Sequence, residues 1–323
     1  MKRGLSISFG ALVVILVTIA LGPRPVIDRT IRFDAASIGQ DIDQWLADEE
    51  SKTPGLRPGA EKEIIWADPQ TKARTPLAII YVHGFSATKW EVRPVPDDVA
   101  KAYGANLFYM RLTGHGASGD AMASASMNAW VNDMAEAIAI GERIAERILI
   151  ISTSTGATLA TWAAGNARLM SKVVGMVLIS PNYESRGYSI GLINMPWGRQ
   201  LLPLIVGKTH AFEPRNEDQG KWWTTSYPSV AGLAMGALQK DVYEMDKTRI
   251  TVPAFFVYSP NDMVIVPTAA QQAYDHWGGP KKLLTIDEAG DPSNHVLTGD
   301  ILSPDTTARI SGEIIEWVKT LKR

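Results

Sequence analysis

The sequence predicts an α/β protein in which a mostly parallel central sheet is covered by helices on both faces. Short, almost continuously apolar runs alternate with longer segments whose apolar residues recur at helical spacing. Strands buried on both faces have this continuous apolar character, because neither face meets water. The predicted strands are Leu77–Val82, Leu107–Met110, Ile148–Ile151, Val173–Ile179, Ala254–Tyr258 and Lys282–Ile286. The predicted helices include Trp130–Ile144, Ala157–Met170 and a terminal helix that begins at Ser303-Pro304.

The first segment of the chain lies outside this alternation. Lys2 and Arg3 precede an apolar run from Leu5 to Leu21, which is the pattern of an export signal. Its length falls within the roughly 17–25 residues that cross a bilayer as a helix. We expect residues 1–22 to be a signal-anchor that tethers the protein to the inner membrane, with its body outside, in the periplasm or the extracellular space. The alternatives are a cleaved signal peptide, which would give a secreted protein, and a buried core helix.

The remaining chain divides into a short leading segment and one large domain. Residues 23–60 are predicted to be a linker and an N-terminal helix, and the linker has Pro and Gly turns near residues 53–59. Residues 61–323 are predicted to form the main domain. Its alternation breaks at about 182–250, a stretch without a strand-like run that is too long for an ordinary loop. We expect a helical cap over the ligand-binding edge of the sheet, with a plain structural excursion as the alternative.

The composition excludes several classes of function. Lys and Arg total 32 against 34 Asp and Glu, so the chain lacks the basic surface that nucleic acid requires. The absence of Cys excludes a thiolate nucleophile and a disulfide framework. We find no metal-ligand spacing or phosphate loop and therefore expect neither a metal nor a cofactor. The weak G-x-G-x-x-G spacing at Gly114 is better explained by the motifs described below. An imidazole base must be one of His83, His115, His210, His276 and His295.

One serine lies on a predicted strand-to-helix turn. The strand at 148–151 runs into Ser152-Thr153-Ser154-Thr155-Gly156, and a helix start follows. A nucleophile on such a tight turn has a strained backbone, so the residues two positions before and after it must be small. Ser154 meets this condition, whereas Ser152 does not, because the residue two positions before it is the bulky Ile150. Ser154 is the candidate nucleophile, and the alternative is an ordinary turn rich in Ser and Thr.

A second motif, His83-Gly84-Phe85, directly follows the strand at 77–82. A loop of this kind brings the backbone N–H of Phe85 beside that of Thr155, the residue after the candidate nucleophile. Two converging N–H groups form an oxyanion hole. We expect His83 to brace this loop rather than to act as a base.

Three motifs in this order resemble the α/β-hydrolase superfamily. They are His83-Gly84-Phe85, the Gly114-His115-Gly116 turn after the next strand, and Ser152-x-Ser154-x-Gly156. The resemblance is strongest to the branch that contains monoacylglycerol lipases, lysophospholipases and serine aminopeptidase-like hydrolases, and it covers about residues 60–323. It implies the α/β-hydrolase fold with a cap insert and a structural role for His115.

The resemblance also implies a catalytic triad in the chain order Ser, acid, His. Asp262, in the turn after the strand at 254–258, is the expected acid, with Glu184 and Asp291 as rivals. His295, between the last strand and the terminal helix, is the expected base. His276 lies in a helical pattern and His210 in the insert, so both are weaker candidates.

These residues imply a serine hydrolase that cleaves carboxylic esters through an acyl-enzyme. The alternatives are a serine peptidase, an acyltransferase, or a non-catalytic partner-binding protein on the same fold. Trp197, Trp222 and Trp223 of the insert are predicted to bind substrate, because apolar side chains near the nucleophile could bury an acyl chain. That interpretation favours lipid-like or monoacyl esters as small-molecule substrates. The alternative is that these tryptophans only pack the cap onto the sheet.

Overall fold

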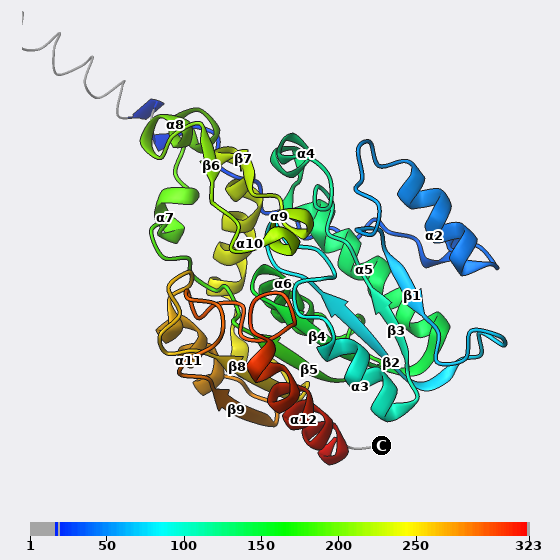
Figure 1. Ribbon diagram of the computed structural model, residues 1–323. Coiled ribbons are helices and arrows are strands. Elements are labelled where there is room, and N and C mark those ends of the chain that lie inside the picture. Colours follow the sequence, from blue (N-terminus) through cyan, green and yellow to red (C-terminus); the bar gives the residue numbers. More distant parts are fainter. Residues whose placement is uncertain (1–16, 19, 322–323) are drawn as a thin grey trace, which may run out of the picture.

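A computed structural model describes residues 17–18 and 20–321 and contains a seven-stranded sheet with the order β1-β3-β2-β4-β5-β8-β9 (Figure 1). Neighbouring strands are parallel except β1, which pairs antiparallel with β3. The strands are β1 (Glu63–Ile65), β2 (Thr75–Val82), β3 (Asn106–Tyr109), β4 (Ala145–Thr153), β5 (Val173–Ile179), β8 (Ala254–Tyr258) and β9 (Lys281–Thr285). The predicted mostly parallel sheet is confirmed, and β1 is an addition that the sequence analysis did not predict.

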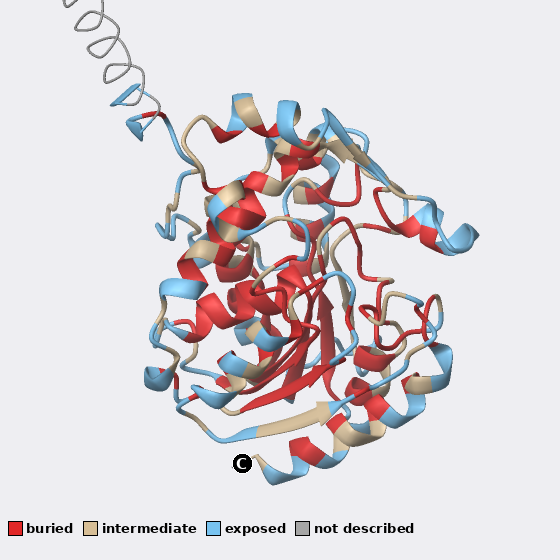
Figure 2. Ribbon diagram, turned by 90° about the vertical axis from the view of Figure 1, so that its left-hand side faces the viewer, coloured by how far each residue is buried: buried red, intermediate tan, exposed pale blue. Residues whose placement is uncertain are grey.

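Helices cover both faces of the sheet, as expected for strands with continuous apolar runs. One core cluster lies between the sheet and α3 (Val95–Tyr103) and α12 (Pro304–Thr320). The other lies under α5 (Met127–Ile144), α6 (Thr155–Ala164) and α11 (Pro267–Asp275). The central strands are buried, whereas the edge strand β9 is half-exposed (Figure 2). The α/β-hydrolase architecture that the motifs implied is therefore present.

The structure corrects one predicted helix boundary. The segment predicted as a helix over 157–170 is the shorter helix α6, which begins at Thr155 and ends at Ala164. Asn166 then accepts hydrogen bonds from the backbone N–H groups of Arg168 and Leu169 and stabilises a separate turn. Asn favours the end of a helix for this reason, since its side chain bonds to the local backbone in competition with the helix.

The insert at 182–250 lies over the carboxyl edge of the sheet (Figure 1). Its helices are α7 (Ile190–Ile193), α8 (Gly198–Ile205), α9 (Glu217–Trp222) and α10 (Gly232–Glu244), with 3-10 turns at Ser229–Ala231 and Lys247–Arg249. It also contains an antiparallel pair, β6 (Thr209–Ala211) with β7 (Ser226–Pro228). The sequence analysis expected helices only, and strands of three residues are too short to produce a recognisable apolar pattern.

The segment that precedes the domain is tied to both the cap and the core. Arg29 forms an ion pair with Asp241 of α10, and the backbone N–H of Phe33 donates to Asn132 of α5. A 3-10 turn at Ala35–Ser37 and helix α2 (Ile42–Ser51) follow, and the Asp41 side chain caps α2. The apolar run at 5–21 lies mostly outside the described residues, so the predicted anchor stays a prediction. Within the described residues, no helix is both long and apolar enough to cross a bilayer.

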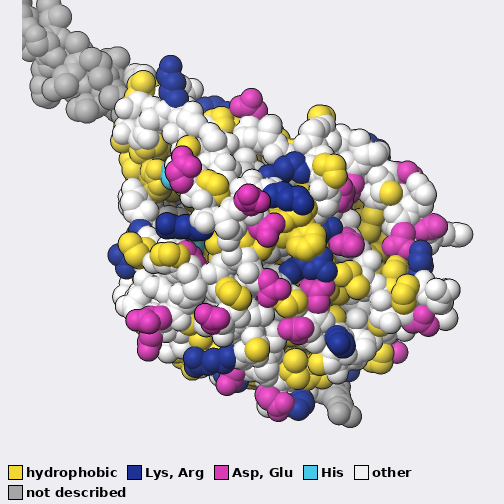
Figure 3. Space-filling model, in the orientation of Figure 1, with side chains coloured by type: hydrophobic (Ala, Val, Ile, Leu, Met, Phe, Trp, Pro, Cys, Tyr) yellow, Lys and Arg dark blue, Asp and Glu magenta, His cyan; other side chains and the backbone are white. Residues whose placement is uncertain are grey.

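Acidic and basic side chains are interspersed on the face shown in Figure 3. This mixture agrees with the nearly balanced formal charge of the chain, −2. The visible face therefore offers no extended basic region of the kind that attracts a phosphate backbone.

A buried ion pair joins α2 to the turn after β3. The Arg111 Nε and Nη2 atoms each lie 2.7 Å from a carboxylate oxygen of Glu50, and both side chains are less than a tenth exposed. Arg111 also donates to the carbonyl of His115, at 3.2 Å. The pair therefore connects the N-terminal helix to the Gly114-His115-Gly116 turn (a short α4, Gly119–Ser124, follows it).

Replacing Glu50 by Ala is expected to destabilise the protein by about 3–5 kcal/mol, because it leaves Arg111 as an unpaired buried charge. Urea denaturation measures this loss as a lower transition midpoint. The matched control is Glu49→Ala on the same helix, whose exposed pair with Lys52 should be worth less than about 1 kcal/mol. Equal midpoints for the two variants would contradict the expectation.

Candidate active site

Ser154 lies on a strained turn between β4 and α6. Its backbone has φ 52° and ψ −117°, a region that residues with a side chain rarely occupy. Gly156 packs against the end of β2, where a Cβ atom would lie 2.3 Å from the carbonyl oxygen of Val82. Ser152 fits before the turn because its hydroxyl donates to the carbonyl of Val177, at 2.9 Å. The turn thus has the small flanking residues that the sequence analysis required.

Ser154, His295 and Asp262 form a chain of hydrogen bonds. His295 Nε2 lies 3.0 Å from Ser154 Oγ, and His295 Nδ1 lies 2.8 Å from Asp262 Oδ2. A carboxylate oxygen can only accept, so Nδ1 carries the hydrogen and Nε2 is free to accept from the serine hydroxyl. Ser154 follows β4, Asp262 follows β8 and His295 follows β9. The parallel sheet brings these three loops together because its strands end at one edge.

The environment favours a histidine that becomes a cation. Burial alone would lower the pKa of His295, but the charge and hydrogen bond of Asp262 outweigh this effect and raise the pKa above its usual range. Asp262 is completely buried, and its Oδ1 accepts from the backbone N–H groups of Val264 and Ile265. The carboxylate is thereby fixed toward the imidazole ring.

The rival residues occupy other positions. Asp291 accepts from the backbone N–H groups of His295 and Val296, so it orders the histidine loop instead of orienting the ring. Glu184 lies at the start of the cap, where its backbone carbonyl accepts from the backbone N–H of Val266. His276 ends α11 at the surface.

The two histidines expected to be structural are buried beside each other, with ring centroids 5.0 Å apart. His83 Nδ1 donates to the carbonyl of Gly84, and its Nε2 accepts from the backbone N–H of Leu112. Burial lowers the pKa of His83 to about 4, so the ring is neutral at pH 7. Burial likewise lowers the pKa of His115 well below its usual range. Both rings brace the turns that follow β2 and β3.

The predicted oxyanion-hole residues lie on two adjoining turns. A Cβ atom on Gly84 would lie 3.1 Å from Ser154 Cβ, so the turn that carries Phe85 runs close beside the candidate nucleophile. Thr155 opens α6, where the first backbone N–H groups of a helix lack partners within it. Among the described residues, the backbone N–H groups of Phe85 and Thr155 have no hydrogen-bond acceptor. Both are free to donate to a substrate oxygen.

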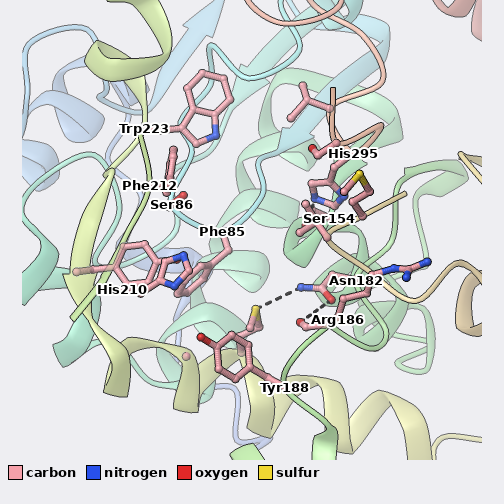
Figure 4. Close-up of a pocket in the computed structure, with 18 of the residues that line it drawn as sticks. Phe85, Ser86, Ser154, Asn182, Arg186, Tyr188, His210, Phe212, Trp223 and His295 are labelled. Atoms are coloured by element: carbon pink, nitrogen blue, oxygen red, sulfur yellow. Dashed lines mark hydrogen bonds between the residues drawn. The ribbon is translucent and has the colours of Figure 1, made fainter. Parts of the chain in front are cut away.

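A cavity of about 430 Å³ separates the Ser154–His295 pair from the cap. Figure 4 shows Ser154 and His295 on one side and Trp223, Phe212 and His210 on the opposite side. Much of its wall is apolar, with contributions from Ile193, Leu202, Val206, Phe212, Trp223 and Met235. Its polar lining includes His210, which the sequence analysis placed only in the insert, and also Arg186 and Arg215.

Of the three tryptophans predicted to bind substrate, only Trp223 lines this cavity. Trp222 is buried and stacks on Trp90, with ring centroids 4.8 Å apart. Trp197 turns the other way, since its backbone N–H donates to the carbonyl of Pro23 and its indole N–H to that of Thr18. The sequence placed all three in the cap, but it did not specify which of its faces each would occupy.

Comparison with known proteins gives one family and several similar structures. The model of a family described as serine aminopeptidase, S33 matches residues 74–290. A thermostable monoacylglycerol lipase of Bacillus sp. (strain H-257) is 24% identical over 201 residues, which is 62% of this chain and 76% of that protein.

Two solved structures share the fold. A structure from work on LipS and LipT, two metagenome-derived lipolytic enzymes, aligns with a TM-score of 0.62 at 21% identity, and the alignment covers 82% of this chain and 99% of that chain. A soluble variant of monoglyceride lipase from Saccharomyces cerevisiae aligns with a TM-score of 0.59 at 12% identity, and the alignment covers 81% of this chain and 92% of that chain.

If His295 acts as a base, activity should fall on acidification with a midpoint above pH 6.5, because the pKa of His295 is raised and only the neutral ring accepts a proton. Asp262→Asn removes the carboxylate charge, so the acidic limb of any residual activity should move to lower pH. The measurement is kcat/KM for a neutral ester from pH 5 to 9. A flat profile, or a limb that Asp262→Asn leaves in place, would refute this assignment.

Proposed function

The chain belongs to the serine aminopeptidase, S33 family, and from this membership and the geometry of the site we propose that it is a serine hydrolase of carboxylic esters. The observation that carries the proposal is the hydrogen-bonded chain from Ser154 Oγ through His295 to the buried Asp262. Ser154 and His295 line a partly apolar cavity. A serine aligned on a neutral imidazole, which is held in turn by a carboxylate, is the arrangement that activates a hydroxyl for attack.

The proposed reaction begins when His295 Nε2 removes the proton of Ser154 as Oγ attacks the ester carbonyl carbon. Asp262 holds the ring and stabilises the imidazolium that forms. The negative oxygen is stabilised by the N–H groups of Phe85 and Thr155, whose loss typically costs about 10²–10³ in kcat per donor. The imidazolium then protonates the leaving alcohol. A water activated by the same histidine hydrolyses the acyl-enzyme and restores Ser154.

The apolar wall of the cavity favours a lipid-like or monoacyl ester. Burial of each methylene of an acyl chain contributes about 0.8 kcal/mol. Ile193, Leu202, Phe212 and Met235 offer surface for such a chain on the cap side of Ser154. The relative from Bacillus sp. is named for monoacylglycerol, which fits this substrate class. A tether at residues 1–22 would hold the cap near amphiphilic substrates, since Pro23 contacts the cap at Trp197.

The description of the family makes peptide hydrolysis the second candidate. An aminopeptidase must recognise the charged amine of its substrate, and the acidic residue Glu213 lines the cavity. Both candidates share the same acyl-enzyme chemistry, so the substrate series below separates them by including aminoacyl p-nitroanilides beside esters.

Ser154→Ala, His295→Ala and Asp262→Asn should each lower kcat for an ester by roughly 10⁴-fold, since these groups act as one unit. A fluorophosphonate probe should label the wild-type protein and leave Ser154→Ala unlabelled. The control is Glu184→Gln, which removes the rival acid and should keep wild-type turnover. Loss of activity in Glu184→Gln with retention in Asp262→Asn would reverse the choice of acid. Labelling that survives Ser154→Ala would refute the proposed nucleophile.

The apolar cavity predicts that kcat/KM rises with acyl length from two carbons to medium chains. A series of p-nitrophenyl esters and monoacylglycerols measures this. Trp223→Ala should reduce the preference for long chains, because Trp223 lines the cavity, whereas Trp222→Ala is the matched control that should leave chain preference unchanged. A maximum at two carbons would exclude the lipid interpretation, and faster turnover of aminoacyl p-nitroanilides would favour a peptidase.

A further inference from the structure

Glu91 is a buried carboxyl group beside the site that the proposed reaction does not use. Its residue is 2% exposed, yet it lines the cavity together with Ser154 and His295. It lies in the loop between β2 and α3, eight residues after His83. Burying a carboxyl group costs free energy unless it has hydrogen-bond partners, so its partners indicate what it does.

One oxygen of Glu91 accepts from two donors on the segment that leads to the turn carrying Phe85, here called the oxyanion turn. Glu91 Oε2 lies 2.7 Å from the backbone nitrogen of Gly84 and 2.9 Å from the Tyr81 hydroxyl. That hydroxyl also lies 3.3 Å from Oγ1 of Thr153, the residue that precedes Ser154. A single carboxyl oxygen is therefore linked to the end of β2, to the turn after it and to the end of β4.

The second oxygen of Glu91 fills the space beside Gly84. A Cβ atom on Gly84 would lie 2.6 Å from Glu91 Oε1 and 3.1 Å from Ser154 Cβ. The carboxyl group and the candidate nucleophile therefore approach the same point of the turn. Any shift of Glu91 would leave the Gly84 N–H without its acceptor, so that the turn presenting Phe85 would lose this bond and keep those to the Gly84 carbonyl.

We propose that Glu91 is a positioning residue: by accepting from the Gly84 N–H and the Tyr81 hydroxyl, it holds the Phe85 N–H against the Ser154 turn in oxyanion-hole geometry. The inference rests on the proposed function, because this geometry has a purpose only if Ser154 performs acyl transfer. An oxyanion hole works only when its donors are fixed in advance, so that none has to reorient during the reaction.

The role depends on the two hydrogen bonds that Glu91 Oε2 accepts. Burial raises the pKa of Glu91, against the opposing effects of the Gly84 N–H, the Tyr81 hydroxyl and the charge of His295. Both bonds need only an acceptor at the place of Oε2. An amide of the same shape should therefore replace it, with its oxygen in the place of Oε2.

The test compares Glu91→Gln, which keeps an acceptor, with Glu91→Met, which has similar length and no acceptor of comparable strength. The rate of p-nitrophenyl ester hydrolysis is divided by the concentration of fluorophosphonate-reactive sites, so that only folded enzyme is counted. For Glu91→Met we expect kcat to fall roughly 10- to 100-fold, with KM changed less than about threefold. This loss is smaller than the roughly 10²- to 10³-fold loss in kcat that follows removal of an oxyanion-hole donor. The fluorophosphonate labelling rate should fall in parallel. Glu91→Gln should recover at least about a third of wild-type kcat.

The matched control is Glu63→Ala on β1, whose carboxylate pairs with Lys89 and does not line the cavity. It should retain the wild-type kcat. Three results would overturn the inference: a wild-type kcat in Glu91→Met, a loss in Glu91→Gln as large as in Glu91→Met, or a rise in KM with kcat unchanged. Failure of the proposed function looks different, because the wild-type protein would then show no labelling that depends on Ser154.

Discussion

The contact between the Ser154 turn and the end of β2 is the constraint on which the rest of the site depends. Gly156 lies so close to the carbonyl groups of Val82 and His83 that a Cβ atom would overlap both. This contact places the start of α6 directly beside the segment that continues into the oxyanion turn. The positive φ of Ser154 is the cost of turning from β4 into α6 within one residue, and the surrounding packing maintains it.

The residues around this contact are held by partners that do not react. His83 and His115 brace the turns after β2 and β3 as neutral rings, and Asp291 orders the loop that carries His295. Glu91 accepts from the Gly84 N–H in the turn that carries Phe85. Reactive groups on loops thus gain the fixed geometry of a core, because each loop backbone is bonded to a buried side chain at the sheet edge.

Sequence reasoning located the candidate residues that follow strands, because a buried parallel strand has a clear pattern and its carboxyl end has a known place. Ser154 was predicted on this basis, whereas Asp262 and His295 were chosen from the loops after strands by the chain order Ser, acid, His that the family resemblance implies. The structure brings the three side chains together. Sequence reasoning also predicted Trp197 and Trp222 to bind substrate, but neither residue lines the cavity. An apolar residue in an irregular insert has no periodic pattern that indicates which way its side chain faces. Glu91 was missed altogether, since one acidic residue in a loop matches no motif and its partner, the Gly84 N–H, belongs to the backbone. The antiparallel pair of β6 and β7 was missed because these strands are three residues long.

The strand order also bears on how the protein acquires activity as it folds. Ser154 and His295 are 141 residues apart in sequence, and their strands β4 and β9 are separated in the sheet by β5 and β8. Closing so long a loop costs chain entropy before the contact stabilises anything, and such non-local contacts slow folding. In the folded protein, the hydrogen bond between the two residues therefore requires that both intervening strands are in place. The time at which ester hydrolysis recovers during refolding therefore reports when the sheet is complete. An N-terminal fragment that ends before β9 lacks His295 and cannot form the contact with Ser154.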